Sequence, residues 1–124
     1  MIDSGIELAV NFACRGARVI FVCEHHVEVP DMLDSAIDLA GENLVKVCKI
    51  NGAQHIKTER GGVIYFFSPG SSGPRGIIAD VVFAPPLVWD DEKLAVALVV
   101  CTNGSTFFDN HGPVMFSTLQ RIGG

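Results

Sequence analysis

The chain has 124 residues, of which 48% are hydrophobic, and its 14 acidic and nine basic side chains give a formal net charge of −5. This length suits one domain, residues 1–124, that buries about two-thirds of its unfolded surface, and the apolar content excludes a disordered segment. The few, dispersed Lys and Arg residues argue against a broad electrostatic contact with nucleic acid, which requires clustered positive charge.

The first third of the chain is predicted to form a helix, a strand and a second helix. The stretch Ile6 to Ala13 is mostly apolar and ends near Gly16, as a buried helix does. The strand Arg18 to Cys23 contains four consecutive apolar residues, which is typical of a strand covered on both faces. A helix should run from Pro30 to about Ala40, because Pro and the Asp that follows it both favour a first helical turn.

The middle of the chain has the pattern of a small antiparallel sheet. Lys46 to Ile50 and His55 to Glu59 both alternate polar and apolar residues, and Asn51-Gly52 between them indicates a tight turn. Gly61-Gly62 then precedes a more apolar strand, Val63 to Phe67. We expect these three segments to pair as antiparallel neighbours.

A loop and a buried strand follow. Gly and Pro residues define the loop from Ser68 to Gly76. The next strand, Ile77 to Phe83, should end at Ala84-Pro85-Pro86, because Pro cannot donate to a sheet ladder.

The C-terminal part is predicted to contain one helix and one strand. Asp90-Asp91-Glu92 is an acidic helix start, Leu94 to Cys101 is the apolar body, and Asn103-Gly104 should close the helix. Pro113 to Ser117 reads as a last short strand. Strands that alternate with helices predict an α/β fold with a mainly parallel sheet, helices on both faces and a small antiparallel hairpin.

The sequence gives no sign of a membrane or secreted protein. Its apolar runs are far shorter than the roughly 20 residues of a membrane helix, and residues 1–10 contain no Lys or Arg to begin a secretory signal. We therefore expect a cytoplasmic location. The absence of a C-x-x-C pair indicates that the four cysteines are reduced core residues rather than disulfides or zinc ligands. They are Cys14, Cys23, Cys48 and Cys101.

Several segments, taken in order, resemble the ATPase domain of the large terminase subunit of tailed bacteriophages. They are Arg18-Val19-Ile20-Phe21, His25, Gly62-Val63-Ile64-Tyr65-Phe66, Ser71-Ser72-Gly73-Pro74-Arg75-Gly76, Ala79-Asp80-Val81-Val82-Phe83 and Ser117-Thr118. The resemblance covers nearly all of the chain. It implies a truncated P-loop NTPase-like (RecA-like) fold, in which Val81 to Phe83 corresponds to the Walker B strand and Ser117-Thr118 to the coupling motif.

The chain departs from that family where hydrolysis takes place. No G-x-x-x-x-G-K-[ST] loop is present, and the helix that should follow it begins almost at Met1, so we expect the loop and its strand to be missing. The Walker B strand should run into an acid pair that holds magnesium and orients the attacking water. This chain has Ala84-Pro85-Pro86 there, and Pro cannot replace either acid. We therefore expect no ATP hydrolysis, no tight ATP binding and no cofactor.

Two groups of residues remain as candidate sites. The resemblance places Arg75 near a nucleotide or a neighbouring subunit, and the backbone N–H groups around it could hold an anion or a partner; a solvated loop is the alternative. That candidate consists of Ser71, Ser72, Gly73, Arg75 and Gly76. The second is the strand exit Glu24-His25-His26, at the edge where α/β sheets usually bind ligands. It has no further His or Cys at helical spacing, so we expect no metal there.

The sequence leaves three functions open. The first is a non-catalytic terminase-like domain, a pseudo-ATPase that acts through protein contacts as a phage assembly factor or as a phage-encoded modulator of a host protein. The second is a fragment of a DNA-packaging ATPase that another chain completes. The third is a weak nucleic-acid-binding remnant, which the acidic charge disfavours.

The missing strand has a consequence for assembly. In the family the P-loop strand lies between the Walker B strand and the coupling-motif strand, here Ile77 to Phe83 and Pro113 to Ser117. Without it, we expect these two strands to close on each other, with homo-oligomerisation through a sheet edge as the alternative.

Overall fold

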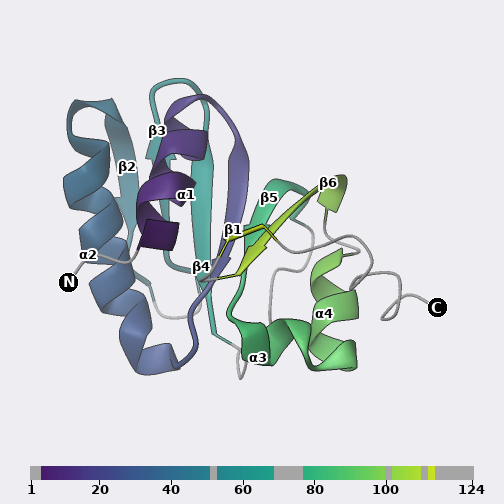
Figure 1. Ribbon diagram of the computed structural model, residues 1–124. Coiled ribbons are helices and arrows are strands. Elements are labelled where there is room, and N and C mark those ends of the chain that lie inside the picture. Colours follow the sequence, from purple (N-terminus) through teal and green to yellow (C-terminus); the bar gives the residue numbers. More distant parts are fainter. Residues whose placement is uncertain (1–3, 51–52, 69–76, 100–101, 110–111, 114–124) are drawn as a thin grey trace.

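The computed structural model of the chain describes residues 4–50, 53–68, 77–99, 102–109 and 112–113. Within them, seven strands form one sheet in the order β2-β3-β4-β1-β5-β6-β7, with helices packed on both faces (Figure 1). The strands are β1 (Arg18–Val22), β2 (Leu44–Cys48), β3 (His55–Thr58), β4 (Val63–Phe67), β5 (Ala79–Phe83), β6 (Thr102–Asp109) and β7 (Gly112–Pro113). The helices are α1 (Ser4–Cys14), α2 (Val29–Ala40), α3 (Pro86–Trp89) and α4 (Glu92–Val99), with short 3-10 helices η1 (His26–Glu28) and η2 (Gly41–Asn43).

β1 lies in the middle of the parallel part of the sheet, between β4 and β5. Val19 and Phe21 belong to the core under α1 and α2, whereas Ile20 belongs to the core under α3 and α4. Successive side chains of a strand point to opposite faces, so a strand covered on both sides is apolar at every position. This is why the unbroken apolar run predicted β1 correctly.

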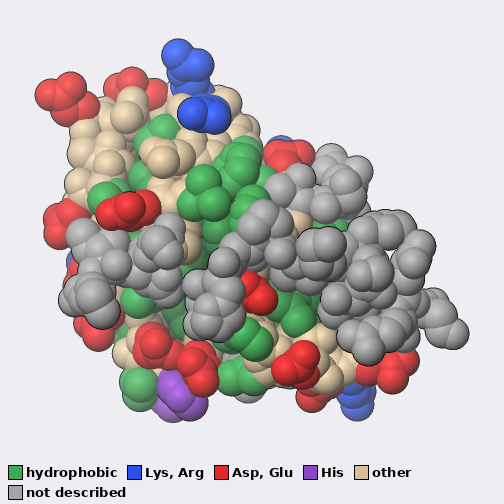
Figure 2. All heavy atoms as spheres, in the orientation of Figure 1, with side chains coloured by type: hydrophobic (Ala, Val, Ile, Leu, Met, Phe, Trp, Pro, Cys, Tyr) green, Lys and Arg blue, Asp and Glu red, His purple; other side chains and the backbone are tan. Residues whose placement is uncertain are grey.

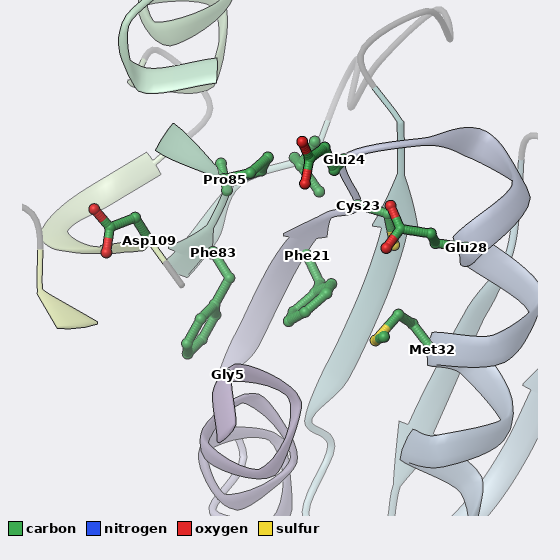
Figure 3. A pocket seen from close by; sticks show the side chains of 11 residues that line it. Gly5, Phe21, Cys23, Glu24, Glu28, Met32, Phe83, Pro85 and Asp109 are labelled. Atoms are coloured by element: carbon green, nitrogen blue, oxygen red, sulfur yellow. The ribbon is translucent and has the colours of Figure 1, made fainter. Parts of the chain in front are cut away.

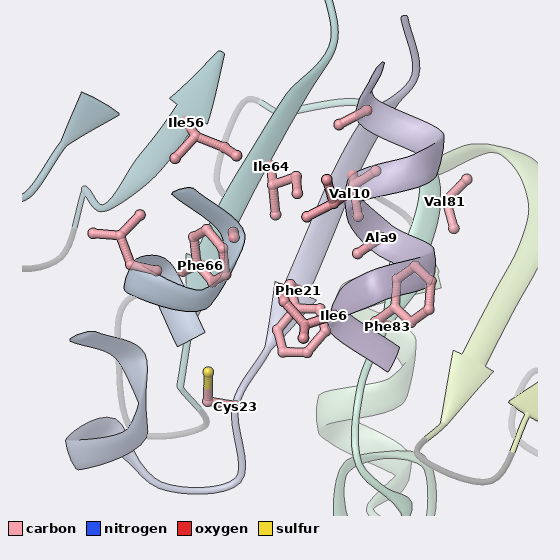
Figure 4. Close-up of a cluster of buried hydrophobic side chains, with 14 of the residues drawn as sticks. Ile6, Ala9, Val10, Phe21, Cys23, Ile56, Ile64, Phe66, Val81 and Phe83 are labelled. Atoms are coloured by element: carbon pink, nitrogen blue, oxygen red, sulfur yellow. The ribbon is translucent and has the colours of Figure 1, made fainter. Parts of the chain in front are cut away.

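The larger core lies between one face of the sheet and helices α1 and α2. Figure 4 shows Ile6 and Ala9 of α1 directed at Phe21 and Phe83 of the strands. Burial of each large side chain of this kind stabilises the fold by about 1.5–3 kcal/mol. Both helices were predicted, and α1 ends where Gly16 adopts a φ of 99°, a conformation that side chains with a Cβ rarely adopt.

The antiparallel patch is confirmed. β3 pairs antiparallel with β2 on one side and with β4 on the other. β4 has the predicted bounds, whereas β2 begins two residues before Lys46 and ends at Cys48 rather than at Ile50. The predicted turn Asn51-Gly52 lies outside the described residues.

The C-terminal third corrects the sequence analysis. Asn103 and Gly104, expected to close the last helix, lie inside β6, which was not predicted. Asn and Gly disfavour strands, but β6 pairs with β5 and contributes Phe107 and Phe108 to the two cores. Tertiary packing thus overrides the local preference. The expected strand Pro113 to Ser117 coincides with β7 only at Pro113, and residues 114–117 lie outside the described part.

β5 ends at Phe83, as predicted, but it starts later than Ile77, and Ile78 before it is exposed. Pro85 ends the strand, and Pro86 begins the short helix α3, which the sequence did not predict. β5 pairs with β1 on one side and β6 on the other. The expectation that it closes directly on the segment beginning at Pro113 was therefore wrong, because both edges of β5 are paired with other strands and Pro113 pairs with β6.

No helix among the described residues is long and apolar enough to cross a membrane. Cys14, Cys23 and Cys48 are free thiols, with Cys23 buried, and Cys101 lies outside the described part. Figure 2 shows several acidic side chains and a His along the lower rim of this face, beneath the end of β1 and α3, with Lys and Arg at the upper end and also at the lower right.

Candidate functional site

A cavity of about 70 Å³ lies at the carboxyl ends of β1 and β5. After β1 the chain builds β4 on one side of it, and after β4 it crosses to build β5 on the other side. The ends of β1 and β5 therefore diverge, and α/β sheets usually bind ligands at such a switch point. We name this hollow the carboxyl-edge cavity. Its lining comprises Gly5, Phe21, Val22, Cys23, Glu24, Glu28, Met32, Phe83, Ala84, Pro85 and Asp109.

The carboxyl-edge cavity has an apolar floor and an acidic rim. Figure 3 shows Phe21 and Phe83 side by side below, Glu24 and Glu28 on the α2 side, and Asp109 on the opposite side. A water molecule occupies about 30 Å³ of liquid, whereas sites for drug-sized ligands span about 300–1,000 Å³. The cavity thus has room for water or a small ion and is far smaller than the site of a drug-sized ligand.

Of the predicted strand exit, Glu24 lines this cavity, whereas His25 is the next residue along the chain and does not line it. His25 has an extended backbone and precedes η1. Its N–H donates to Glu28 Oε1 at 2.8 Å, and the Glu28 N–H donates to the His25 carbonyl at 3.0 Å. The first bond is the half of a helix-capping box that the N3 glutamate supplies, and the second is the backbone bond of a 3-10 turn; together they fix Glu28 beside the end of β1.

Glu28 is the residue that the sequence analysis missed. One ligand atom from each of Glu24, His25 and Glu28 lies within 4.8 Å of the others, and His26 is not part of this group. The sequence argument searched for a further His or Cys and left carboxylates out. The spacing Glu-His-x-x-Glu directly after a buried strand was the available signal, because one turn of a short helix brings its ends together.

The end of β5 carries no acidic side chain. Ala84 and Pro85 are both buried, and the Ala84 N–H donates to the Phe108 carbonyl at 2.9 Å. Asp90 lies at the C-terminal end of α3, and the Lys93 N–H donates to Asp91 Oδ1 at 3.0 Å at the start of α4. Asp91 thus lies at the start of a helix, in agreement with the sequence, whereas Asp90 ends α3 instead of opening α4.

The other predicted site, Ser71 to Gly76 with Arg75, lies outside the described residues. Comparison of the chain with protein-family models, curated proteins and solved structures finds no significant match in any of the three.

Proposed function

We propose that this chain is a non-catalytic, terminase-like α/β domain that acts by contacting another protein, as a phage assembly factor or a modulator of a host protein. The observation that carries the proposal is the end of β5. Ala84 and Pro85 follow β5 directly, at the positions where the terminase ATPases that this chain resembles have two acidic residues.

Hydrolysis of a nucleotide requires a carboxylate that holds magnesium and a group that orients the attacking water. The methyl of Ala84 and the ring of Pro85 can do neither. The acids that line the carboxyl-edge cavity come from the loop after β1, from η1 and from β6, and the cavity of about 70 Å³ is far below the volume of drug-sized ligand sites. These features support binding rather than turnover.

The pairing of β5 favours this function over the ATPase fragment completed by another chain. A P-loop strand beside β5 would have to displace β1 or β6. β6 is held by the stacked rings of Phe83 and Phe108, whose centroids lie 4.8 Å apart, and by Trp89 Nε1, which donates to the Phe108 carbonyl at 3.1 Å. A P-loop strand from another chain that took the place of β6 would break these contacts.

A protein is a better partner for this surface than a nucleic acid. The net charge of −5 and the acidic rim both repel phosphate. β2 lies at one edge of the sheet, and Val45 on it is 64% exposed. An edge strand with an exposed apolar side chain is a surface to which an extended segment of another protein can add.

The experiment has two arms on the purified chain. The first measures ATP binding and magnesium-dependent hydrolysis, and we expect neither; micromolar ATP affinity or steady turnover would overturn the proposal. The second captures partners from a host lysate with wild type, Val45→Asp and Val96→Asp, the last changing a partly exposed valine on α4. We expect one partner that Val45→Asp loses and Val96→Asp retains. Equal capture by all three variants would contradict the contact through β2.

A further inference from the structure

We propose that Glu24, His25 and Glu28 bind a divalent transition-metal ion at the rim of the carboxyl-edge cavity. Each residue directs one ligand atom into the same small region, where all three atoms lie within 4.8 Å of one another. The site is independent of the function proposed above.

The spacing suits a single ion. Nitrogen and oxygen ligands lie about 2.0–2.2 Å from such a metal, so two ligands of one ion are at most about 4.4 Å apart. Glu24 and His25 are exposed and Glu28 is half-buried, so their side chains can make the remaining adjustment of a few tenths of an ångström without moving the core. The ion would then be bound by one histidine and two carboxylates on one side, and its remaining coordination positions would be open to water.

The backbone fixes the ligands before the ion arrives. Glu28 Oε1 accepts a hydrogen bond from the His25 N–H, which holds its carboxylate over the residue that carries the imidazole ligand. A carboxylate has about four lone-pair sites on two oxygens, so the cap leaves capacity for a metal. Hydrogen bonds that orient a ligand in this way commonly strengthen metal binding.

The local charge also favours a cation. The carboxylates of Glu24 and Glu28 both line the carboxyl-edge cavity, and among the described residues its lining includes no Lys or Arg. A bound cation would relieve the repulsion between Glu24 and Glu28, and the cavity has room for about two waters to complete its coordination.

The ligand types select the metal class. An imidazole suits zinc, iron and other transition metals, whereas carboxylates and water suit manganese and magnesium. A mixed set therefore prefers a first-row transition ion to Mg²⁺ or Ca²⁺. Mn²⁺ is the better probe, because the thiols of Cys14, Cys23 and Cys48 would compete for Zn²⁺.

The test titrates Mn²⁺ into the full chain and follows free Mn²⁺ by electron paramagnetic resonance. We expect one ion per chain, at least tenfold weaker binding in His25→Ala and in Glu28→Gln, and wild-type binding in His26→Ala. Gln at position 28 can still accept the bond that caps η1, so its effect reports the ligand rather than the cap.

Thermal unfolding supplies the second readout. Mn²⁺ should raise the Tm of wild type and of His26→Ala but not of His25→Ala or Glu28→Gln, while the four proteins unfold alike without metal. No binding at about 1 mM Mn²⁺, unchanged binding in His25→Ala, or an equal loss in His26→Ala would each overturn the proposal. Mg²⁺ binding as tight as Mn²⁺ binding would overturn the assignment to a transition metal.

Discussion

The Thr58 hydroxyl donates a hydrogen bond of 2.7 Å to the carbonyl oxygen of Ala13, 45 residues earlier in the chain. Both residues are buried, and the bond joins the end of β3 to the last turn of α1. It satisfies a hydroxyl that would otherwise lie in an apolar interior.

Thr58→Val should destabilise the fold by about 1 kcal/mol, because it replaces the hydroxyl with a methyl that faces two carbonyl oxygens, those of Ala13 and Gly62. The Ala13 oxygen keeps one partner, the N–H of Gly16 at 2.9 Å, which limits the loss. Urea unfolding followed by circular dichroism measures the change. A midpoint at or above that of wild type would show that the bond contributes nothing.

Gly62→Ala should be more damaging, since a Cβ at this position would collide with the carbonyl of Ala13. Backbone atoms cannot move aside as a flexible side chain can, so we expect a loss of about 3 kcal/mol or more. Gly61→Ala is the matched control. Gly61 has open space around it but a φ of 85°, which should cost only about 1–2 kcal/mol. Equal losses in the two variants would mean that α1 does not approach Gly62 this closely.

Some elements of the fold could be predicted from the sequence and others could not. β1 and β4 are recognisable because a central strand must be apolar on both faces, and α2 because Pro30 and an apolar stripe mark its start and buried side. β6 could not be recognised, because Asn103 and Gly104 are typical of a helix end. It forms a strand only because its backbone pairs with the edge of β5 and because Phe107 and Phe108 pack into the two cores.

The candidate site was predicted in part. A strand exit at the carboxyl edge follows from alternating strands and helices; Glu24 and His25 both follow β1, and Glu24 lines the cavity. Glu28 lies near them because η1 turns the chain back, and Asp109 lines the same cavity because it ends β6. A side chain contributed by an unpredicted strand cannot be assigned to a site in advance.

Trp89→Phe should destabilise the fold by about 2 kcal/mol. The change removes the bond from Trp89 Nε1 to the Phe108 carbonyl and part of the edge-to-face contact with Phe107, at 5.6 Å between ring centroids. Leu87→Ala in the same short helix is the control, because Leu87 is 41% exposed and its truncation should cost less, about 1 kcal/mol. Urea midpoints followed by circular dichroism compare the two, since the variant lacks the single tryptophan. If Leu87→Ala proved the more damaging change, the anchoring of β6 by Trp89 would be refuted.

The most direct measurement of the proposed function is the rate of magnesium-dependent ATP hydrolysis by the complex of this chain with its captured partner, compared with the partner alone. We expect no hydrolysis that the partner alone lacks, because β5 ends in Ala84 and Pro85 and both its edges are paired. We also expect Arg75→Ala to leave the rate of the complex unchanged. Turnover that appears only in the complex and disappears with Arg75→Ala would show that the chain completes an ATPase, and would contradict a non-catalytic role.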